Sequence, residues 1–482
     1  MLLDAVRRVC HDVLTVAPPE IKPVVEDVLQ TLAEPLRLAV AGRVKAGKST
    51  LVNALVGRLV APTRAGECTK VVTWYRYGSP DRAEIVRRDG VRLPMRFDGA
   101  LPEDPGIPVD QVDHLEVHLQ SGTLRNLTLI DTPGLATTTV ENEAGTRRAL
   151  LGEGIVSAKA TSQADAVLYV FRDAERQHEV DFLRDMKDSF GTLGATAATV
   201  VGLLSHADLF GDDPWSGQDP FAVAADQAAR LAVQRAAELG GVVPVAALLA
   251  QTARTGQLRE ADVRALAALD SVDSVLLQIA DEIGPPEGID AEQLAALFAR
   301  LGPYGVAAGR HVAARGSGEL LQWLRTVSGI ATVEELIHSQ FLRRAHALKA
   351  DNALTKLERA ANGPGRNAVL GIVEAARQSP EMHPIRQLRA LGLLMQSAPT
   401  SALRAELMHV IDAQDDREIL GAPPEAHPGQ LVAVARDAGA RAQAKAGFAT
   451  SPAEAEAARV LARSYLLLAR RQEARVGQGW RP

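Results

Sequence analysis

The segment that most constrains the fold is Gly42-x-x-x-x-Gly47-Lys48-Ser49, which follows the apolar run 36–42. A glycine-rich turn between a buried strand and a helix binds phosphate, because its backbone N–H groups converge at a helix N-terminus. In such a loop Lys48 reaches the β- and γ-phosphates and the Ser49 hydroxyl binds Mg²⁺. The segment therefore predicts an α/β P-loop domain, with a mostly parallel sheet and helices on both faces.

We expect the whole loop to contact nucleotide. It contains a second lysine, Lys45, three residues before the lysine that such loops require. The predicted phosphate contacts are Gly42, Arg43, Val44, Lys45, Ala46, Gly47, Lys48, Ser49 and Thr50.

Two further segments predict the metal site. The apolar run LTLID ends in Asp131, which is expected in the outer shell of the metal, and the N–H of Gly134 is expected to contact the γ-phosphate. Between this run and the loop, a mobile segment should donate a Thr hydroxyl to Mg²⁺. Thr69 directly precedes a β-rich run and is the preferred candidate, with Thr63 and Thr73 as competitors. The predicted metal residues are thus Ser49, Thr69 and Asp131.

Base recognition is predicted where the apolar strand TVVGLL ends in Ser205, His206 and Asp208. The Asp208 carboxylate can accept hydrogen bonds from guanine N1–H and N2–H₂, which adenine does not offer, and the imidazole of His206 can stack on the purine. The alternative interpretation of Asp208 is a helix cap after a strand. A last base-contacting loop is expected at Ala246, after the run VVPV.

The periodicity divides the chain into three parts. Residues 1–35 show helical spacing and should join a neck, 36–255 alternate strands with helices as a GTPase domain, and 256–482 carry only helical periodicity. Long helices without strands bury their apolar stripes on each other, so the last part predicts an all-α neck and trunk bundle. The segments RRDGVR and QSGTLRN carry turn residues and predict antiparallel hairpins at one sheet edge.

Composition excludes several functions. The net charge of −6 argues against nucleic acid as a partner. Two cysteines provide no disulfide framework, the histidines show no zinc-like spacing with them, and no apolar run could span a bilayer. These features predict a cytoplasmic protein that meets any membrane peripherally.

These motifs, followed by a long helical half, resemble the dynamin superfamily, and specifically the actinobacterial isoniazid-inducible type of bacterial dynamin-like protein. The segments SGIATVEELIHSQFLRRAHALKADNALTKLE and ARVLARSYLLLARRQEA also look like that family. The resemblance implies GTP hydrolysis with Mg²⁺ and a neck built from both chain ends. It also implies pairing of GTPase heads, with a second copy or a paralogue, and membrane remodelling at the cytoplasmic face of the cell membrane.

The resemblance also gives a hypothesis for Lys45. Eukaryotic dynamins carry Gln and Ser where this chain has Val44 and Lys45, and their heads recruit a monovalent cation near the β/γ bridge. We hypothesise that Lys45 supplies this charge in cis, and the alternative is a solvent-facing lysine. The expected catalytic residues are Lys45, Lys48 and Thr69, with the backbone of Thr69 positioning the attacking water.

The expected membrane contacts lie in a helix-connecting loop and in the C-terminal tail. The candidates are Val369, Leu370, Ile372 and Trp480. The alternative function is a non-membrane regulatory GTPase whose bundle binds a protein partner. A GTPase that docks on RNA is disfavoured by the acidity of the chain, and a motor ATPase would be distinguished by its base selectivity.

Overall fold

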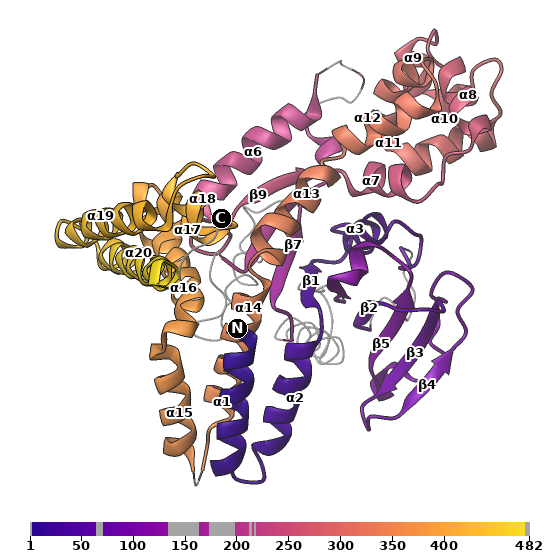
Figure 1. Cartoon of the computed structure of the whole chain (residues 1–482). Helices are drawn as coiled ribbons and strands as arrows, with labels where there is room; N and C mark the ends of the chain where they lie inside the picture. Colours follow the sequence, from indigo (N-terminus) through magenta and orange to yellow (C-terminus); the bar gives the residue numbers. More distant parts are fainter. Residues whose placement is uncertain are drawn as a thin grey trace.

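The computed structural model describes residues 2–63, 71–133, 163–172, 198–211, 215, 218–363 and 365–477. Three predicted site residues, Thr69, Gly134 and Trp480, lie outside the described residues. A central sheet carries one group of helices at an end, a second below it and a third to the side (Figure 1). Among the described helices, none has the length and apolar character that crossing a bilayer would require.

The sheet has nine strands in the order β4-β3-β5-β2-β6-β1-β7-β8-β9. Their bounds are β1 Leu36–Gly42, β2 Thr73–Tyr77, β3 Arg82–Arg87, β4 Arg92–Met95, β5 Val112–Leu119, β6 Leu127–Asp131, β7 Ala166–Phe171, β8 Val200–Ser205 and β9 Val242–Val245. The strands from β6 to β9 in this order run parallel to one another. The mostly parallel sheet predicted from the sequence is therefore confirmed.

The central strands are apolar throughout because both faces of the sheet are covered. In β1, Leu38 and Val40 pack with α3 (Lys48–Val56) and α7 (Ala247–Arg254) on one face. Ala39 and Ala41 pack with α6 (Pro220–Gln234) on the other face. This alternation follows from the two-residue period of a strand.

The outer strands confirm one predicted hairpin and correct another. RRDGVR lies in the antiparallel β3–β4 hairpin at the sheet edge. QSGTLRN, by contrast, connects β5 to β6, and these strands do not pair because β2 lies between them. The hairpin prediction for this segment was wrong.

The helices of the head and its flanking lobe are α3 Lys48–Val56, α6 Pro220–Gln234, α7 Ala247–Arg254, α8 Glu260–Ala268, α9 Ser274–Gln278, α10 Ala280–Ile283, α11 Ala291–Ala313, α12 Ser317–Val327 and α13 Ile330–Leu336. The remaining helices are α1 Leu2–Val16, α2 Lys22–Ala33, α14 Ala345–Ala360, α15 Arg366–Gln378, α16 His383–Ser397, α17 Ala402–Asp412, α18 Asp416–Leu420, α19 Pro428–Gly447 and α20 Pro452–Gly477. A π-helix, Ile337–Leu342, joins α13 to α14.

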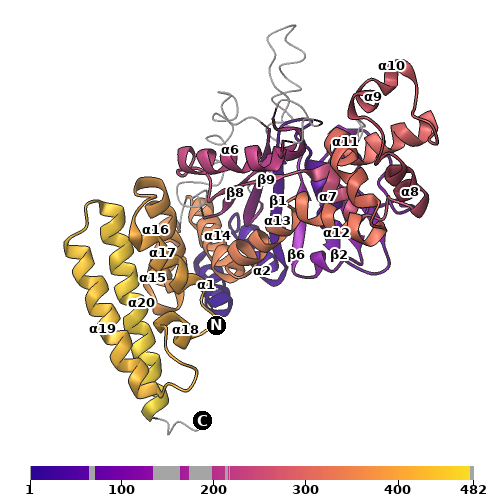
Figure 2. The ribbon, with the colours of Figure 1, turned by 90° about the horizontal axis from the view of Figure 1, so that it is seen from above.

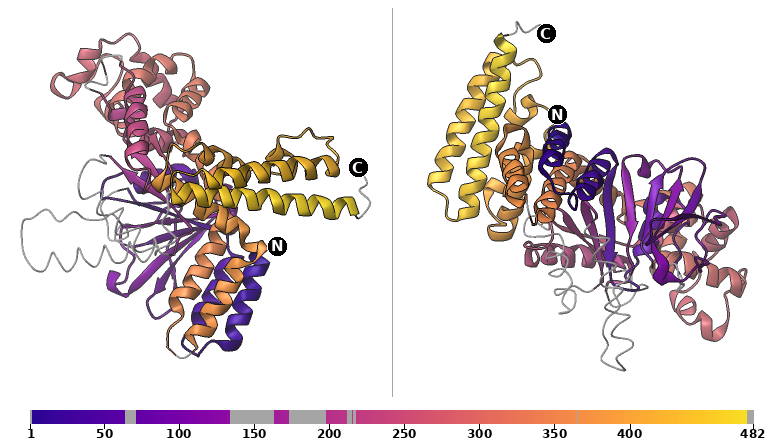
Figure 3. Two further views of the ribbon diagram at one scale, coloured as in Figure 1. Left: turned by 90° about the vertical axis from the view of Figure 1, so that its left-hand side faces the viewer. Right: turned by 90° about the horizontal axis from the view of Figure 1, so that it is seen from below.

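The helices form three separate hydrophobic cores. The first core joins α7 to α8–α12 beside the sheet, the second joins α1 and α2 to α14 and α15, and the third joins α16, α17, α19 and α20. Figure 2 shows α19 and α20 side by side, and Figure 3 shows this pair projecting away from the sheet. The N-terminal helices α1 and α2 pack with α14 and α15, and the helices of residues 256–482 are divided among different cores.

The helix is interrupted at Ser328 and Gly329, which separate α12 from α13. Gly329 has φ +75°, and a Cβ there would lie 2.6 Å from the Pro244 carbonyl oxygen of β9. The chain can therefore turn here, against the end of the sheet, only at a glycine.

Candidate functional site

The phosphate loop begins where β1 ends, and its geometry depends on two glycines. A Cβ on Gly42 would lie 2.1 Å from the Val170 carbonyl oxygen of β7, so no other residue fits against that strand. Gly47 has φ +93° and is the N-cap of α3. Together these glycines direct the loop backbone to the N-terminus of a helix, as phosphate binding requires.

Lys48 and Ser49 lie at the start of α3 and face Asp131 at the end of β6. The Lys48 ammonium donates a 2.8 Å hydrogen bond to the Arg43 carbonyl oxygen, so the side chain folds back over its own loop. The Ser49 hydroxyl donates a 3.0 Å hydrogen bond to Asp131 Oδ2. Three residues predicted for phosphate and metal binding are therefore brought together.

The charge state of Asp131 reflects its burial. Burial raises the pKa of the Asp131 carboxyl to about 6, although the Lys48 charge and the Ser49 hydrogen bond oppose this shift. No described residue donates a hydrogen bond to its buried Oδ1. A buried oxygen without a donor fits a Mg²⁺-bound water, and a cation at this position would favour the ionised carboxylate.

The end of β6 is fixed to the phosphate-loop strand by Thr132, a residue that the sequence analysis did not single out. Its backbone N–H and its hydroxyl both donate to the Val40 carbonyl oxygen of β1, at 3.3 and 3.0 Å. These bonds hold Asp131 beside the loop. Thr132 directly follows Asp131, so the segment that predicted a metal site also contained this threonine.

The predicted base-recognition residues lie next to the loop. His206, after β8, has φ +57°, and the Ser205 hydroxyl is 3.0 Å from its Nδ1. A Cβ on Gly47 would lie 3.9 Å from His206 Cε1, so the imidazole packs beside the phosphate loop. Asp208 follows and is buried.

A second residue missed in the sequence, Arg172, follows β7 at the same edge. Burial lowers the pKa of His206, and the positive charge of Arg172 lowers it further. Burial also raises the pKa of Asp208, an effect that Arg172 partly offsets. The sequence contained a signal for Arg172. This residue directly follows β7, which neighbours β1, and parallel strands end at one edge of the sheet.

Ala246, the predicted last base-contacting residue, is fully buried at the start of α7. Its N–H donates a 2.9 Å hydrogen bond to the Ser328 carbonyl oxygen. The next residue, Ala247, has its Cβ 3.8 Å from the position of a Cβ on Gly47. The segment lies near the loop, but the Ala246 N–H is already used within the protein.

Val44 and Lys45 form the exposed crest of the loop. Val44 is 54% exposed, and Lys45 is exposed with φ +64°, a conformation that a residue with a side chain adopts at a cost. The exposed position of Lys45 is therefore compatible both with a charge supplied to bound nucleotide and with a solvent-facing lysine.

The expectation that Val369 contacts a membrane is corrected by the structure. Val369 is 0% exposed and packs in the core formed by α1, α2, α14 and α15. Leu370 and Ile372 are partly buried against the same core. Their side chains hold α15 against the neck, because the apolar stripe of an amphipathic helix faces inward.

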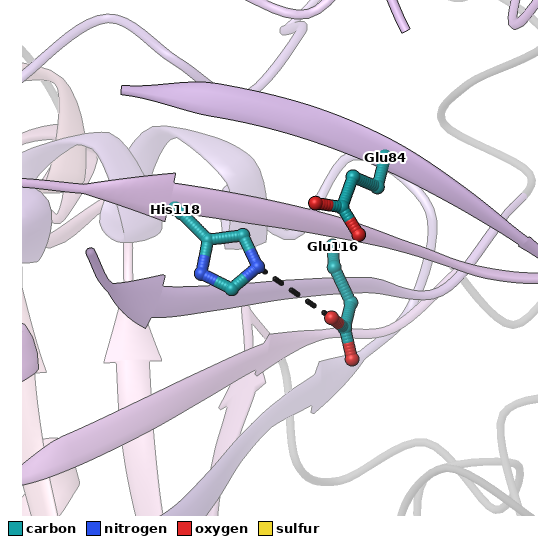
Figure 4. Close-up of side chains that lie close together, drawn as sticks. All are labelled: Glu84, Glu116 and His118. Atoms are coloured by element: carbon teal, nitrogen blue, oxygen red, sulfur yellow. Dashed lines mark ion pairs between the residues drawn. The ribbon is translucent and has the colours of Figure 1, made fainter. Parts of the chain in front are cut away.

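Glu84 on β3 and Glu116 and His118 on β5 form another group of potential metal ligands, with ligand atoms within 4.8 Å of one another (Figure 4). His118 Nε2 lies 3.6 Å from Glu116 Oε2. Burial would raise the pKa of Glu116, but hydrogen bonds from His114, His118 and Arg92 hold it well below its usual range. Because arginine already neutralises these carboxylates, we interpret the group as an ion-pair network.

The phosphate loop lies in a part of the chain that matches a known protein family. A model of the dynamin family matches residues 38–201. The isoniazid-induced protein IniC of Mycobacterium tuberculosis is 34% identical over 388 residues, which cover 77% of this chain and 76% of IniC. A bacterial dynamin-like protein of Nostoc punctiforme is 28% identical over 155 residues, or 29% of this chain and 20% of that protein. A solved structure of an oligomerised bacterial dynamin pair aligns with 98% of this chain and 74% of its own, at 14% identity and a TM-score of 0.34.

The match to IniC extends well beyond the nucleotide motifs, because it covers about three quarters of both proteins. This chain therefore belongs to the dynamin family, as a homologue of the isoniazid-induced bacterial dynamin-like proteins.

Proposed function

We propose that the protein hydrolyses GTP with Mg²⁺ and couples turnover to peripheral membrane binding and remodelling. The observation that carries the GTPase proposal is the meeting of Lys48, Ser49 and the underbonded Asp131 at the edge of the sheet. Membership of the dynamin family supports the same activity.

In this proposal each residue of the site has a separate role. The backbone N–H groups of the loop and the Lys48 ammonium bind the β- and γ-phosphates. The Ser49 hydroxyl would ligate Mg²⁺ directly, Asp131 would hold a metal-bound water, and Thr69 would complete the metal site. Bound Mg²⁺ would supply neutralisation of the charge that develops on the phosphates. Lys45 would add a further positive charge from the crest of the loop.

Guanine selectivity is assigned to Asp208. Its buried carboxylate lies after β8, two residues beyond His206, whose ring packs beside the phosphate loop. The carboxylate would accept guanine N1–H and N2–H₂ in a site where water competes poorly, so the hydrogen bonds would discriminate strongly.

The membrane contact is proposed at a different place from the one predicted. Phe448 lies between α19 and α20 and is 87% exposed, at the end of this pair opposite the C-terminus. An exposed phenylalanine at the end of a long helical pair can insert into the interfacial region of a bilayer. We therefore propose this end of the α19–α20 pair as the membrane-contacting end at the cytoplasmic face. Pairing of heads, between two copies or with a paralogue, would drive remodelling.

The membrane proposal is tested by GTP turnover and co-sedimentation with anionic vesicles for wild type and Phe448→Ser. Val233→Ser is a matched control, because Val233 on α6 is also strongly exposed, at 74%. We expect vesicle binding and vesicle-stimulated turnover to fall at least tenfold in Phe448→Ser alone. A wild type that hydrolyses GTP yet ignores vesicles would instead support the regulatory GTPase, whose bundle binds a protein partner.

A further inference from the structure

A cavity of about 550 Å³ lies between the start of strand β1 and the helices α2 and α14, away from the phosphate loop. It is lined by the end of α2 and the start of β1, by the segment before β6, and by the π-helix with the beginning of α14. Figure 1 shows α2 and α14 at this side of the sheet. The volume is in the range of small-molecule sites.

Basic and imidazole side chains outnumber carboxylates in the lining of this cavity. Its basic and imidazole side chains are Arg125, His338, Arg343, His346 and Lys349, and its carboxylate is that of Glu34. Glu34 is already neutralised, because Arg37 and Arg76 bind its Oε2 at 2.7 and 3.2 Å. Burial would raise the pKa of Glu34, but the charges and hydrogen bonds of these two arginines hold it below its usual value. The cavity therefore presents an excess of positive charge.

Three of the basic groups are available to a ligand. Within the described part of the chain, His338, Arg343 and His346 have neither a hydrogen-bond partner nor an ion-pair partner for their side chains, and all three are exposed. Lys349, in contrast, donates to the carbonyl oxygens of Leu32 and Glu34 and holds α2 to α14. Lys349 thus fixes one wall of the cavity, whereas the three free groups are exposed.

The backbone places two of the free groups together. Residues Ile337–Leu342 form a π-helix, and the Arg343 N–H donates a 3.0 Å hydrogen bond to the His338 carbonyl oxygen. This five-residue turn brings His338 and Arg343 to the same cavity. Single π-turns inside helices are frequent at functional sites.

We propose that this cavity, the junction pocket, binds a small polyanion that carries two or more phosphate or carboxylate groups. Arg343 would bind one anionic group bidentately, and His338, His346 and Arg125 would bind the remaining ones. Such a ligand would contact the head, the N-terminal helices and the π-helix at once. Because the pocket is formed between these elements, we favour a soluble ligand over a lipid headgroup.

The test uses inorganic pyrophosphate as the probe and isothermal titration of the full chain. Pyrophosphate would also bind the phosphate loop, so binding is compared in wild type, Lys48→Ala and the double variant Arg343→Gln/His346→Gln. We expect two classes of site in wild type, retention of the junction site in Lys48→Ala, and at least tenfold weaker junction binding in the double variant. Arg325→Gln, an exposed arginine on α12, controls for loss of general positive charge.

Thermal unfolding of each variant accompanies the titration, because the replaced Arg343 and His346 have no described partners and should leave the fold intact. If all pyrophosphate binding disappears in a folded Lys48→Ala variant, the junction pocket is not a polyanion site. Cardiolipin vesicles form a separate arm. A double variant that loses vesicle binding but titrates pyrophosphate like wild type would overturn the soluble ligand in favour of a lipid headgroup.

Discussion

The Ser49 hydroxyl donates a 3.0 Å hydrogen bond to Asp131 Oδ2, although the two residues are 82 positions apart in the chain. The bond joins the start of α3 to the end of β6. Replacing Ser49 by alanine should therefore remove a proposed Mg²⁺ ligand and leave the position of Asp131 less defined. We expect the Mg²⁺ concentration that half-saturates nucleotide binding to rise at least about tenfold.

The measurement is the Mg²⁺ concentration that half-saturates nucleotide binding. Ser49→Thr keeps the hydroxyl and should stay close to wild type. Equal Mg²⁺ requirements for Ser49→Ala and wild type would contradict the assignment.

Replacing Lys45 by glycine should raise the stability of the fold but slow the hydrolysis of GTP. Its φ of +64° is unfavourable for a side chain, so Lys45→Gly should stabilise the fold by roughly 1 kcal/mol. If the ammonium supplies charge near the β/γ bridge, the same variant should hydrolyse GTP at least tenfold more slowly and should respond to added K⁺. Thermal unfolding and turnover with and without K⁺ check both parts. A wild type that itself requires K⁺ would reject the charge role, and Lys45→Arg serves as the charge-retaining control.

Gly329 is predicted to be necessary for the turn between α12 and α13. Gly329 and Gly256 have similar φ values, +75° and +68°, but a Cβ on Gly329 would lie 2.6 Å from the Pro244 carbonyl oxygen, whereas nothing lies within 4 Å of one on Gly256. Gly256→Ala should cost about 1–2 kcal/mol through its backbone conformation alone. Gly329→Ala should cost about 1–3 kcal/mol more because of the clash. Denaturant midpoints of the two variants test this, and equal losses would show that the contact is unimportant.

We expect His383 of α16 to make the packing of this helix against α20 sensitive to acid. Burial lowers the pKa of His383 to about 4, and the charges of Arg463, Arg386 and Arg471 act in the same direction. Its Nε2 lies 2.8 Å from the Ser464 hydroxyl of α20. Because the unfolded chain binds this proton more readily, His383 should cost stability as pH falls from about 6.5 towards 4, by up to about 3 kcal/mol.

Urea unfolding of wild type and His383→Gln between pH 7 and pH 4.5 measures this effect. The glutamine keeps a polar group near Ser464 without gaining a proton. The difference between the two proteins should therefore shrink or reverse as the pH falls. A difference that stays constant across this range would exclude His383 as a cause of acid sensitivity.

The sequence was most informative where chemistry and pattern coincide. The run 36–42 and the glycines of the loop predicted the parallel sheet, because they form one strand-loop-helix unit. The motifs also selected Ser49 and Asp131, which the structure joins by a hydrogen bond. The predicted base-recognition residues His206 and Asp208 follow β8, which runs parallel to β7 and β1 and so ends at the same edge of the sheet.

Features that depend on long-range packing were not predictable from local patterns. The turn residues of QSGTLRN gave no information on the pairing of the flanking strands, which β2 separates. Helical periodicity likewise did not reveal that α8–α12 pack on α7 rather than on the neck. For Val369 a signal existed, because Val369 and Val373 lie one turn apart on the buried stripe of α15.

Phosphate release from GTP and from ATP by the full chain, with Mg²⁺ and with EDTA, tests the central claim most directly. We predict that GTP is hydrolysed only with Mg²⁺, that ATP is a poor substrate, and that Lys48→Ala is inactive towards both. Equal hydrolysis of ATP, or GTP turnover that persists in EDTA or in Lys48→Ala, would contradict the proposed Mg²⁺-dependent GTPase.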